Sequence, residues 1–113
     1  MIHKTAIVDP KAKISTNVNI GPYSIIGPNV EIGEHTVINS HVSIAGYTKI
    51  GKNSIIAGQV GIAGSSSIGN NVKIGGQAGI SGHLKIGNNV EIAGGSGVIK
   101  DIPDNSKVIG YPA

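Results

Sequence analysis

The chain is 113 residues long, enough for one domain with one continuous core. It has no Cys, Phe or Trp, which excludes disulfides and thiolate metal sites and predicts a core of small aliphatic side chains in a regular, repeating shape. All nine basic residues are lysines and the net charge is only +3, so the guanidinium groups that read phosphates and bases are missing. We therefore expect no nucleic-acid partner.

At the N-terminus, residues 1–5 show no apolar run after the first lysine, so we expect no secretory signal peptide. Farther along, no apolar stretch is long enough to span a bilayer. These features predict a cytoplasmic protein without a membrane span.

From Ile2 onward, every sixth residue is Ile or Val as far as Val98. Two residues before each of these Ile or Val residues is a second series of positions, which carries smaller side chains such as Ala12, Val18 and Ser24. Residues two apart in a strand face the same side, so each hexad is expected to be a short strand followed by a turn. The turns read Ile-Gly-Pro, Ile-Gly-Asn and Ile-Ala-Gly, with residue types that tight bends require.

The residue just before each inward Ile or Val is expected to face outward. The residue types at these outward positions indicate that three hexads make one coil. Sorted with a period of eighteen, these positions separate into a charged column, an uncharged column and a mixed column. The charged column is Lys13, Glu31, Lys49, Ser67 and Lys85, and the uncharged column is Ile7, Ile25, Ser43, Gly61, Gly79 and Gly97. We interpret Glu31 as an ion-pair partner of the two neighbouring lysines, and the uncharged column as a surface for self-association.

The fold predicted from this pattern is an all-β parallel β-helix, a solenoid with three strands per coil and five to six coils. We expect a single domain over residues 1–113, with regular hexads over 1–100 and a C-terminal cap or tail over 101–113. One corner column contains Asn17, His35, Asn53, Asn71 and Asn89, which suits a left-handed backbone conformation there.

The Ile-Gly-x-x-(Val/Ser/Thr)-x hexads resemble the hexapeptide-repeat acyltransferases of lipid A synthesis, and this resemblance implies a left-handed helix and a homotrimer. Residues 1–53, with Ala6-Ile7-Val8-Asp9-Pro10 and Ile20-Gly21-Pro22-Tyr23, resemble UDP-N-acetylglucosamine O-acyltransferase. Residues 54–113, with Ile56-Ala57-Gly58-Gln59-Val60-Gly61 and Ile80-Ser81-Gly82-His83, resemble UDP-3-O-acylglucosamine N-acyltransferase. Because two halves match two enzymes, and the loops that wall their active sites are absent, we interpret the chain as an engineered chimera or minimal β-helix.

The resemblance also bears on catalysis. Both enzymes use a His in an Ile-Ala-His motif as general base, and the matching position here is Gly46 in Ile44-Ala45-Gly46-Tyr47. The remaining candidates are His83, which matches an assisting His and is expected in the corner column of Gly46, and His41. We therefore expect no catalytic residue and a non-catalytic scaffold.

The alternative is an active acyltransferase that moves a 3-hydroxyacyl group from acyl carrier protein to a UDP-amino sugar, with His41 or His83 as base. We expect no cofactor. We also expect no metal site, because His35, His41 and His83 fall on three different corners and cannot share an ion within one chain.

Overall fold

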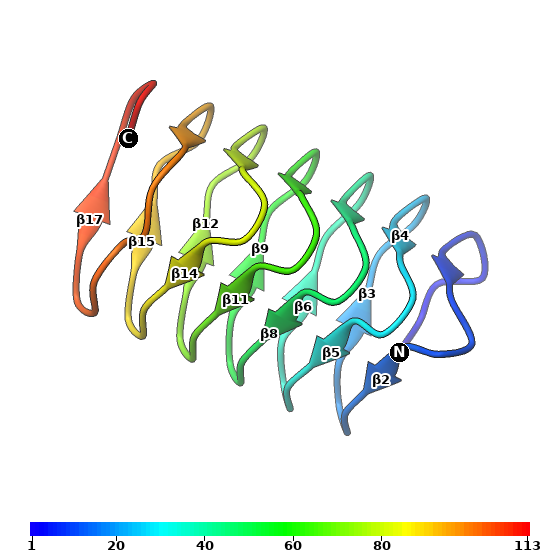
Figure 1. The fold of residues 1–113 in the computed structure, drawn as a ribbon. Coiled ribbons are helices and arrows are strands. Elements are labelled where there is room, and N and C mark those ends of the chain that lie inside the picture. The colour runs from blue at the N-terminus through cyan, green and yellow to red at the C-terminus, as the bar shows by residue number, and fades with distance from the viewer.

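A computed structural model describes residues 1–113 and contains seventeen short strands and no helix (Figure 1). The strands are β1 Ile7–Val8, β2 Lys13–Ile14, β3 Asn19–Ile20, β4 Ile25–Ile26, β5 Glu31–Ile32, β6 Val37–Ile38, β7 Ser43–Ile44, β8 Lys49–Ile50, β9 Ile55–Ile56, β10 Gly61–Ile62, β11 Ser67–Ile68, β12 Lys73–Ile74, β13 Gly79–Ile80, β14 Lys85–Ile86, β15 Glu91–Ile92, β16 Gly97–Val98 and β17 Lys107–Val108. No part of the chain forms a helix that is long and apolar enough to span a bilayer.

The strands form three parallel sheets that wrap into a solenoid of about six coils, as the repeat predicted, and the helix is left-handed, as the resemblance implied. Sheet 1 contains β1, β4, β7, β10, β13 and β16; sheet 2 contains β2, β5, β8, β11 and β14; sheet 3 contains β3, β6, β9, β12, β15 and β17. Figure 1 shows the coils stacked from the N-terminal end to the C-terminal end, and the whole measures 34 × 20 × 20 Å.

The predicted period of eighteen is the register of the sheets. Ile7 pairs with Ile25 in sheet 1, Lys13 with Glu31 in sheet 2, and Asn19 with Val37 in sheet 3. The outward columns read from the sequence are therefore the outward faces of the three sheets. Inward residues from Val18 to Ile102 form one buried cluster along the axis.

The corners differ from expectation in one respect. A left-handed backbone was expected mainly in the asparagine column, but fourteen non-glycine residues have φ between 54° and 64°, and they occupy all three corners. They include Tyr23, Tyr47, Gln59 and Ser65 as well as the asparagines. The tight turn of each corner requires this conformation, so side chains less suited to it than Asn adopt it as well.

The last coil is two residues shorter than the others. Ile102 bridges to Ile86 and Lys107 pairs with Glu91, an offset of sixteen instead of eighteen. Residues 102–108 thus continue the helix. The tail then lies along sheet 1, where the N–H of Gly97 donates to the carbonyl of Gly110 and the N–H of Ala113 donates to the carbonyl of Gly97, both at 2.9 Å.

Candidate functional site

The position that the resemblance assigns to a catalytic base lies in the corner after β7, between sheets 1 and 2. A Cβ placed on Gly46 would lie 3.0 Å from the carbonyl oxygen of Pro28 and 3.3 Å from its Cγ, in the coil below. Tyr47, the next residue, donates its N–H to the same oxygen at 3.0 Å. The same spacing recurs one coil above, where a Cβ on Gly64 would lie 3.0 Å from the carbonyl oxygen of Gly46, so it is a general feature of this corner. As glycine, residue 46 supplies no general base there.

His83 lies on the same side of the helix but in a different column from the expected one. Gly82 is the residue that follows Gly46 and Gly64 along this corner, whereas His83 stacks in line with Tyr47 and Ser65. Its backbone is left-handed, with φ of 60°, and its N–H donates to the carbonyl of Gly64 at 3.1 Å. The side chain is exposed and makes no hydrogen bond.

His41 and His35 occupy the two other corners. The His41 ring lies 5.3 Å from the ring of Tyr23, tilted by 33°. Their backbone N–H groups donate to the carbonyls of Pro22 and Thr16 respectively, each in the coil below. The structure brings none of these imidazoles next to His83, and it contains no group of three or more His, Asp or Glu side chains arranged to hold a metal ion.

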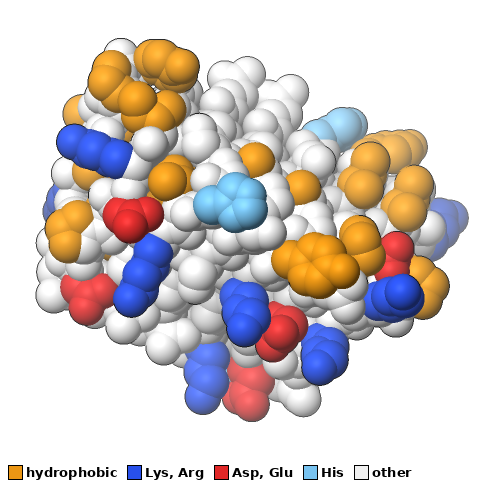
Figure 2. All heavy atoms as spheres, in the orientation of Figure 1, with side chains coloured by type: hydrophobic (Ala, Val, Ile, Leu, Met, Phe, Trp, Pro, Cys, Tyr) orange, Lys and Arg blue, Asp and Glu red, His pale blue; other side chains and the backbone are white.

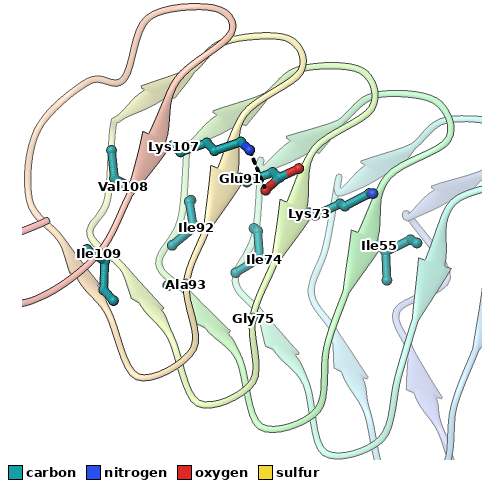
Figure 3. A pocket seen from close by; sticks show the side chains of 10 residues that line it. All are labelled: Ile55, Lys73, Ile74, Gly75, Glu91, Ile92, Ala93, Lys107, Val108 and Ile109. Atoms are coloured by element: carbon teal, nitrogen blue, oxygen red, sulfur yellow. Dashed lines mark ion pairs between the residues drawn. The ribbon is translucent and has the colours of Figure 1, made fainter.

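Four shallow grooves mark the surface. Two lie on sheets 3 and 1 and are lined mostly by apolar residues. The other two, on sheet 2 and beside the last coil, are lined by charged residues such as Glu31 and Asp101. The groove on sheet 3 encloses about 430 Å³ and runs over β12, β15 and β17, with Ile55 and Ile109 at its ends (Figure 3). Lys107 and Glu91 form an ion pair at 3.9 Å on its rim, while the ammonium of Lys73 lies farther along the same rim.

The groove on sheet 1 encloses about 550 Å³. Its floor is the bare backbone of Gly61 and Gly79, and its far end is closed by Tyr111, whose ring lies directly on Gly97. No imidazole lines any of the four grooves. None of them therefore presents a histidine as general base next to a place where a substrate could lie.

The structure does not show the ion pairs that we interpreted from the sequence for Glu31 in the charged column. Glu31 is in register with Lys13 and Lys49, but it forms no ion pair with either; the one ion pair in the structure joins Glu91 and Lys107. Figure 2 shows lysines and acidic side chains interspersed over one side of the molecule, where they are free to point into solvent. An exposed lysine gains little free energy from a fixed ion pair, so the charged column is a solvated face.

Several solved structures share the fold of this chain. A variant of GDP-perosamine N-acetyl transferase from Caulobacter crescentus, solved with CoA and GDP-perosamine, is 26% identical with a TM-score of 0.97; the match covers 99% of this chain and 53% of that one. LpxA from Acinetobacter baumannii is also 26% identical, with a TM-score of 0.51 over 98% of this chain and 71% of its own. Both are hexapeptide-repeat acyltransferases.

The acetyltransferase domain of PglB from Neisseria gonorrhoeae superimposes with a TM-score of 0.99 at 23% identity, covering 100% of this chain and 55% of that chain, and so shows the shared fold. The chain spans about half the length of the solved acetyltransferases that it matches most fully. No curated protein sequence matches it. The model of the GMPPB C-terminal domain matches residues 2–107, nearly the whole chain, and the protein therefore belongs to the GMPPB C-terminal domain family.

Proposed function

We propose that this chain is a structural β-helix that shares the scaffold of the acyltransferases but performs no acyl transfer by itself. The observation that carries the proposal is Gly46, which has no side chain at the corner position that the resemblance assigns to the general base. His35, His41 and His83 lie on three separate corners, and the His3 ring is hydrogen-bonded to the Thr5 hydroxyl at 2.9 Å. No groove is lined by a histidine. General-base catalysis needs an imidazole within hydrogen-bond reach of the nucleophile.

The proposal includes the origin of the chain as a chimera of two enzymes of lipid A synthesis, joined near residue 53. The register of eighteen residues continues without a break from β1 to β16, across that junction, as an in-phase fusion of two β-helices requires. The proposal also treats residues 1–113 as one domain that resides in the cytoplasm, with 101–113 as its cap.

A second candidate function is acyl transfer itself. It is favoured by the likeness to GDP-perosamine N-acetyl transferase, which was solved with CoA and a sugar nucleotide. In this reading the donor is acyl carrier protein, the acceptor is a UDP-amino sugar, and His41 or His83 acts as base, with a neighbouring chain completing the site.

We further propose that the chain self-associates into a homo-oligomer through the uncharged face of sheet 1. The resemblance implies a trimer, which would have three times the chain mass of 11.4 kDa. Exposed Ile7 and Ile25 supply the apolar area that drives association.

One assay separates the two functions. The folded protein is incubated with 3-hydroxyacyl-loaded acyl carrier protein and either UDP-N-acetylglucosamine or its 3-O-acylated 2-amino derivative, and the acylated sugar is measured. We expect no product above a blank without protein. Product that disappears in the His83→Ala or His41→Ala variant, with the circular dichroism spectrum unchanged, would establish the acyltransferase and reject the scaffold proposal.

A further inference from the structure

The groove on sheet 3 combines an apolar floor with a charged rim, and it differs in this from the other three grooves. The groove on sheet 1 has no charged lining residue. The grooves on sheet 2 and beside the last coil are lined mainly by charged, polar and glycine residues. Binding sites for small molecules are mostly apolar clefts in which a few polar groups fix the orientation of the ligand. Of the four grooves, only the one on sheet 3 has this composition.

The floor of this groove is flat because sheet 3 has a second outward column with small residues. Residues two apart in a strand face the same side, so the residues two positions after the first outward column also point outward. In the groove these are Gly75 and Ala93, and Ile109, with 78% of its surface exposed, closes the end. The N–H groups of Gly75 and Ala93 donate to carbonyls of the next coil at 2.7 and 3.0 Å. The floor therefore offers no free N–H donor, and it suits a flat apolar group.

The chain itself holds an aromatic ring against bare backbone on another face. The Tyr111 ring lies on Gly97 of sheet 1, so closely that a Cβ added to Gly97 would collide with it. The outer surface of this β-helix thus accommodates a flat ring where a strand residue has no side chain. Gly75 offers the same kind of surface in the groove on sheet 3. A planar ring placed there covers apolar area without separating any backbone hydrogen bond.

The rim of the groove supplies one cation without a partner. Glu91 is in register with Lys73 on one side and Lys107 on the other, but its ion pair is with Lys107, at 3.9 Å. Figure 3 shows the Lys73 side chain extending toward Ile55, away from this ion pair. The Lys73 ammonium forms no ion pair with the chain, and the rim has a net charge of +1 from two lysines and one glutamate. An anionic ligand group at this end of the groove would complement that charge.

We propose that the groove on sheet 3 is a binding site for an aromatic carboxylate. The ring lies over Gly75 and Ala93 and against Ile109, and the carboxylate accepts a hydrogen bond from the Lys73 ammonium. The apolar floor and the single cation thus recognise the two parts of one small molecule. This binding activity is separate from acyl transfer and from self-association, because sheet 3 is a different face from the uncharged sheet 1.

Titration of the isotope-labelled chain with cinnamate, followed by NMR of the backbone amides, tests the site. We expect the Gly75 and Ala93 signals to shift with a roughly millimolar dissociation constant, as a shallow groove allows for a ligand of this size. The signals of Gly61 and Gly79, in the uncharged groove on sheet 1, should stay unchanged. Cinnamyl alcohol has the same ring without the charge, and it should bind roughly threefold to fivefold more weakly.

Two substitutions with matched controls separate the charge from the floor. Lys73→Met removes the ammonium and should weaken cinnamate roughly threefold to fivefold, leaving cinnamyl alcohol unaffected. Lys49→Met, at the same strand position on sheet 2, should change neither ligand. Ala93→Leu fills the floor and should abolish the shifts, whereas Ala57→Leu, in the same column but outside the groove, should preserve them.

Circular dichroism checks that each variant keeps the fold. The proposal is overturned if millimolar cinnamate shifts neither Gly75 nor Ala93, or if it shifts the glycines of sheet 1 equally. Equal affinities for cinnamate and cinnamyl alcohol, or a Lys73→Met variant that binds cinnamate like the wild type, would overturn it as well, because the ammonium would then play no part in recognition.

Discussion

Six inward positions carry hydroxyl groups in place of aliphatic side chains, and these hydroxyls link successive coils. The Ser54 hydroxyl donates to the carbonyl of Gly69 at 3.2 Å and accepts the N–H of Val72 at 3.1 Å. One coil below, the Thr36 hydroxyl accepts the N–H of Ser54. No buried side-chain polar atom lacks a partner, so the inward Ser and Thr residues are compatible with the apolar core around them.

Ser54→Ala should therefore destabilise the fold although it leaves only a small gap. The Val72 N–H loses its acceptor inside the core, which costs about 1–3 kcal/mol in the free energy of unfolding. Urea denaturation measures the change. Ser67→Ala removes the same hydroxyl from an exposed outward position and should alter stability by less than about 0.5 kcal/mol. Equal effects of the two substitutions would contradict the role of the buried hydroxyl.

Two glycines that look alike in the sequence differ in what surrounds them. At Gly69 an added Cβ would collide with the Asn88 carboxamide oxygen, which accepts the Asn70 N–H at 2.8 Å, and with the carbonyl of Gly87. At Gly61 the same atom would meet nothing. The first glycine is required by close approach of the next coil, and the second is not.

Gly69→Ala should lower the free energy of unfolding by about 1–3 kcal/mol, because the neighbouring coil must move. Gly61→Ala should leave it within about 0.5 kcal/mol of the wild-type value. Thermal unfolding of the two variants under identical conditions makes the comparison. If both lost stability equally, a general requirement for glycine would replace the argument from packing.

At the scale of the element, the strands are equivalent in hydrogen bonding but not in burial. The Ile7 N–H donates to Ser24 and the Ile55 N–H donates to Val72, both at 2.8 Å. The first coil, however, has another coil on only one side. Its inward Val8 and Ile14 are half-buried, and Ile2 remains 45% exposed. The stability of a solenoid coil comes mainly from its neighbours, so this coil should open before the others.

Amide hydrogen exchange followed by NMR tests that order. We expect the Ile7 amide to exchange about 100-fold faster than the Ile55 amide, since local opening of an end requires less free energy than global unfolding. The two amides make a matched pair, because both belong to outward isoleucines with hydrogen bonds of the same length. Exchange of Ile7 as slow as that of Ile55 would show that the first coil is held as firmly as the centre.

Much of this element pattern could be predicted from the sequence, because one spacing fixes inward face, outward face and register together. The pairing of Ile7 with Ile25 and of Lys13 with Glu31 follows directly from a period of eighteen. The ion pairing of Glu31 does not follow, because register brings side chains side by side without fixing where their flexible ends point.

The last coil and the corners were harder to predict for a different reason. Ile99 and Ile102 are both apolar, yet only the second is buried, at 3% exposure, while the first is 52% exposed. Ile99 directly follows the inward Val98 and so faces outward in the regular register. The burial of Ile102 could not be predicted, because the last coil is two residues shorter than the period. Nor could the sequence show that Tyr111 lies on Gly97, since these residues are fourteen apart and lie outside the period of eighteen.

For the whole molecule, contacts run almost entirely between adjacent coils, and each sheet is one uninterrupted ladder. No residue ties the N-terminal coil to the C-terminal one. The properties of the assembly therefore depend on the three outer faces, of which sheet 2 is charged, sheet 3 is mixed and sheet 1 is uncharged.

From β1 to β16, each coil repeats the one before it at an offset of eighteen residues. A whole coil can therefore be removed or added without changing which side chains face inward. Deleting residues 55–72 joins Ser54 to Lys73, which has the column position of Ile55. We expect a folded rod, one coil shorter, with a smaller dependence of unfolding free energy on urea. Deleting 55–71 instead shifts every later side chain by one and points the isoleucines outward, so that chain should not fold. Circular dichroism and urea titration distinguish the two deletion variants. If the expectation holds, evolution or design can lengthen such a protein only in whole coils.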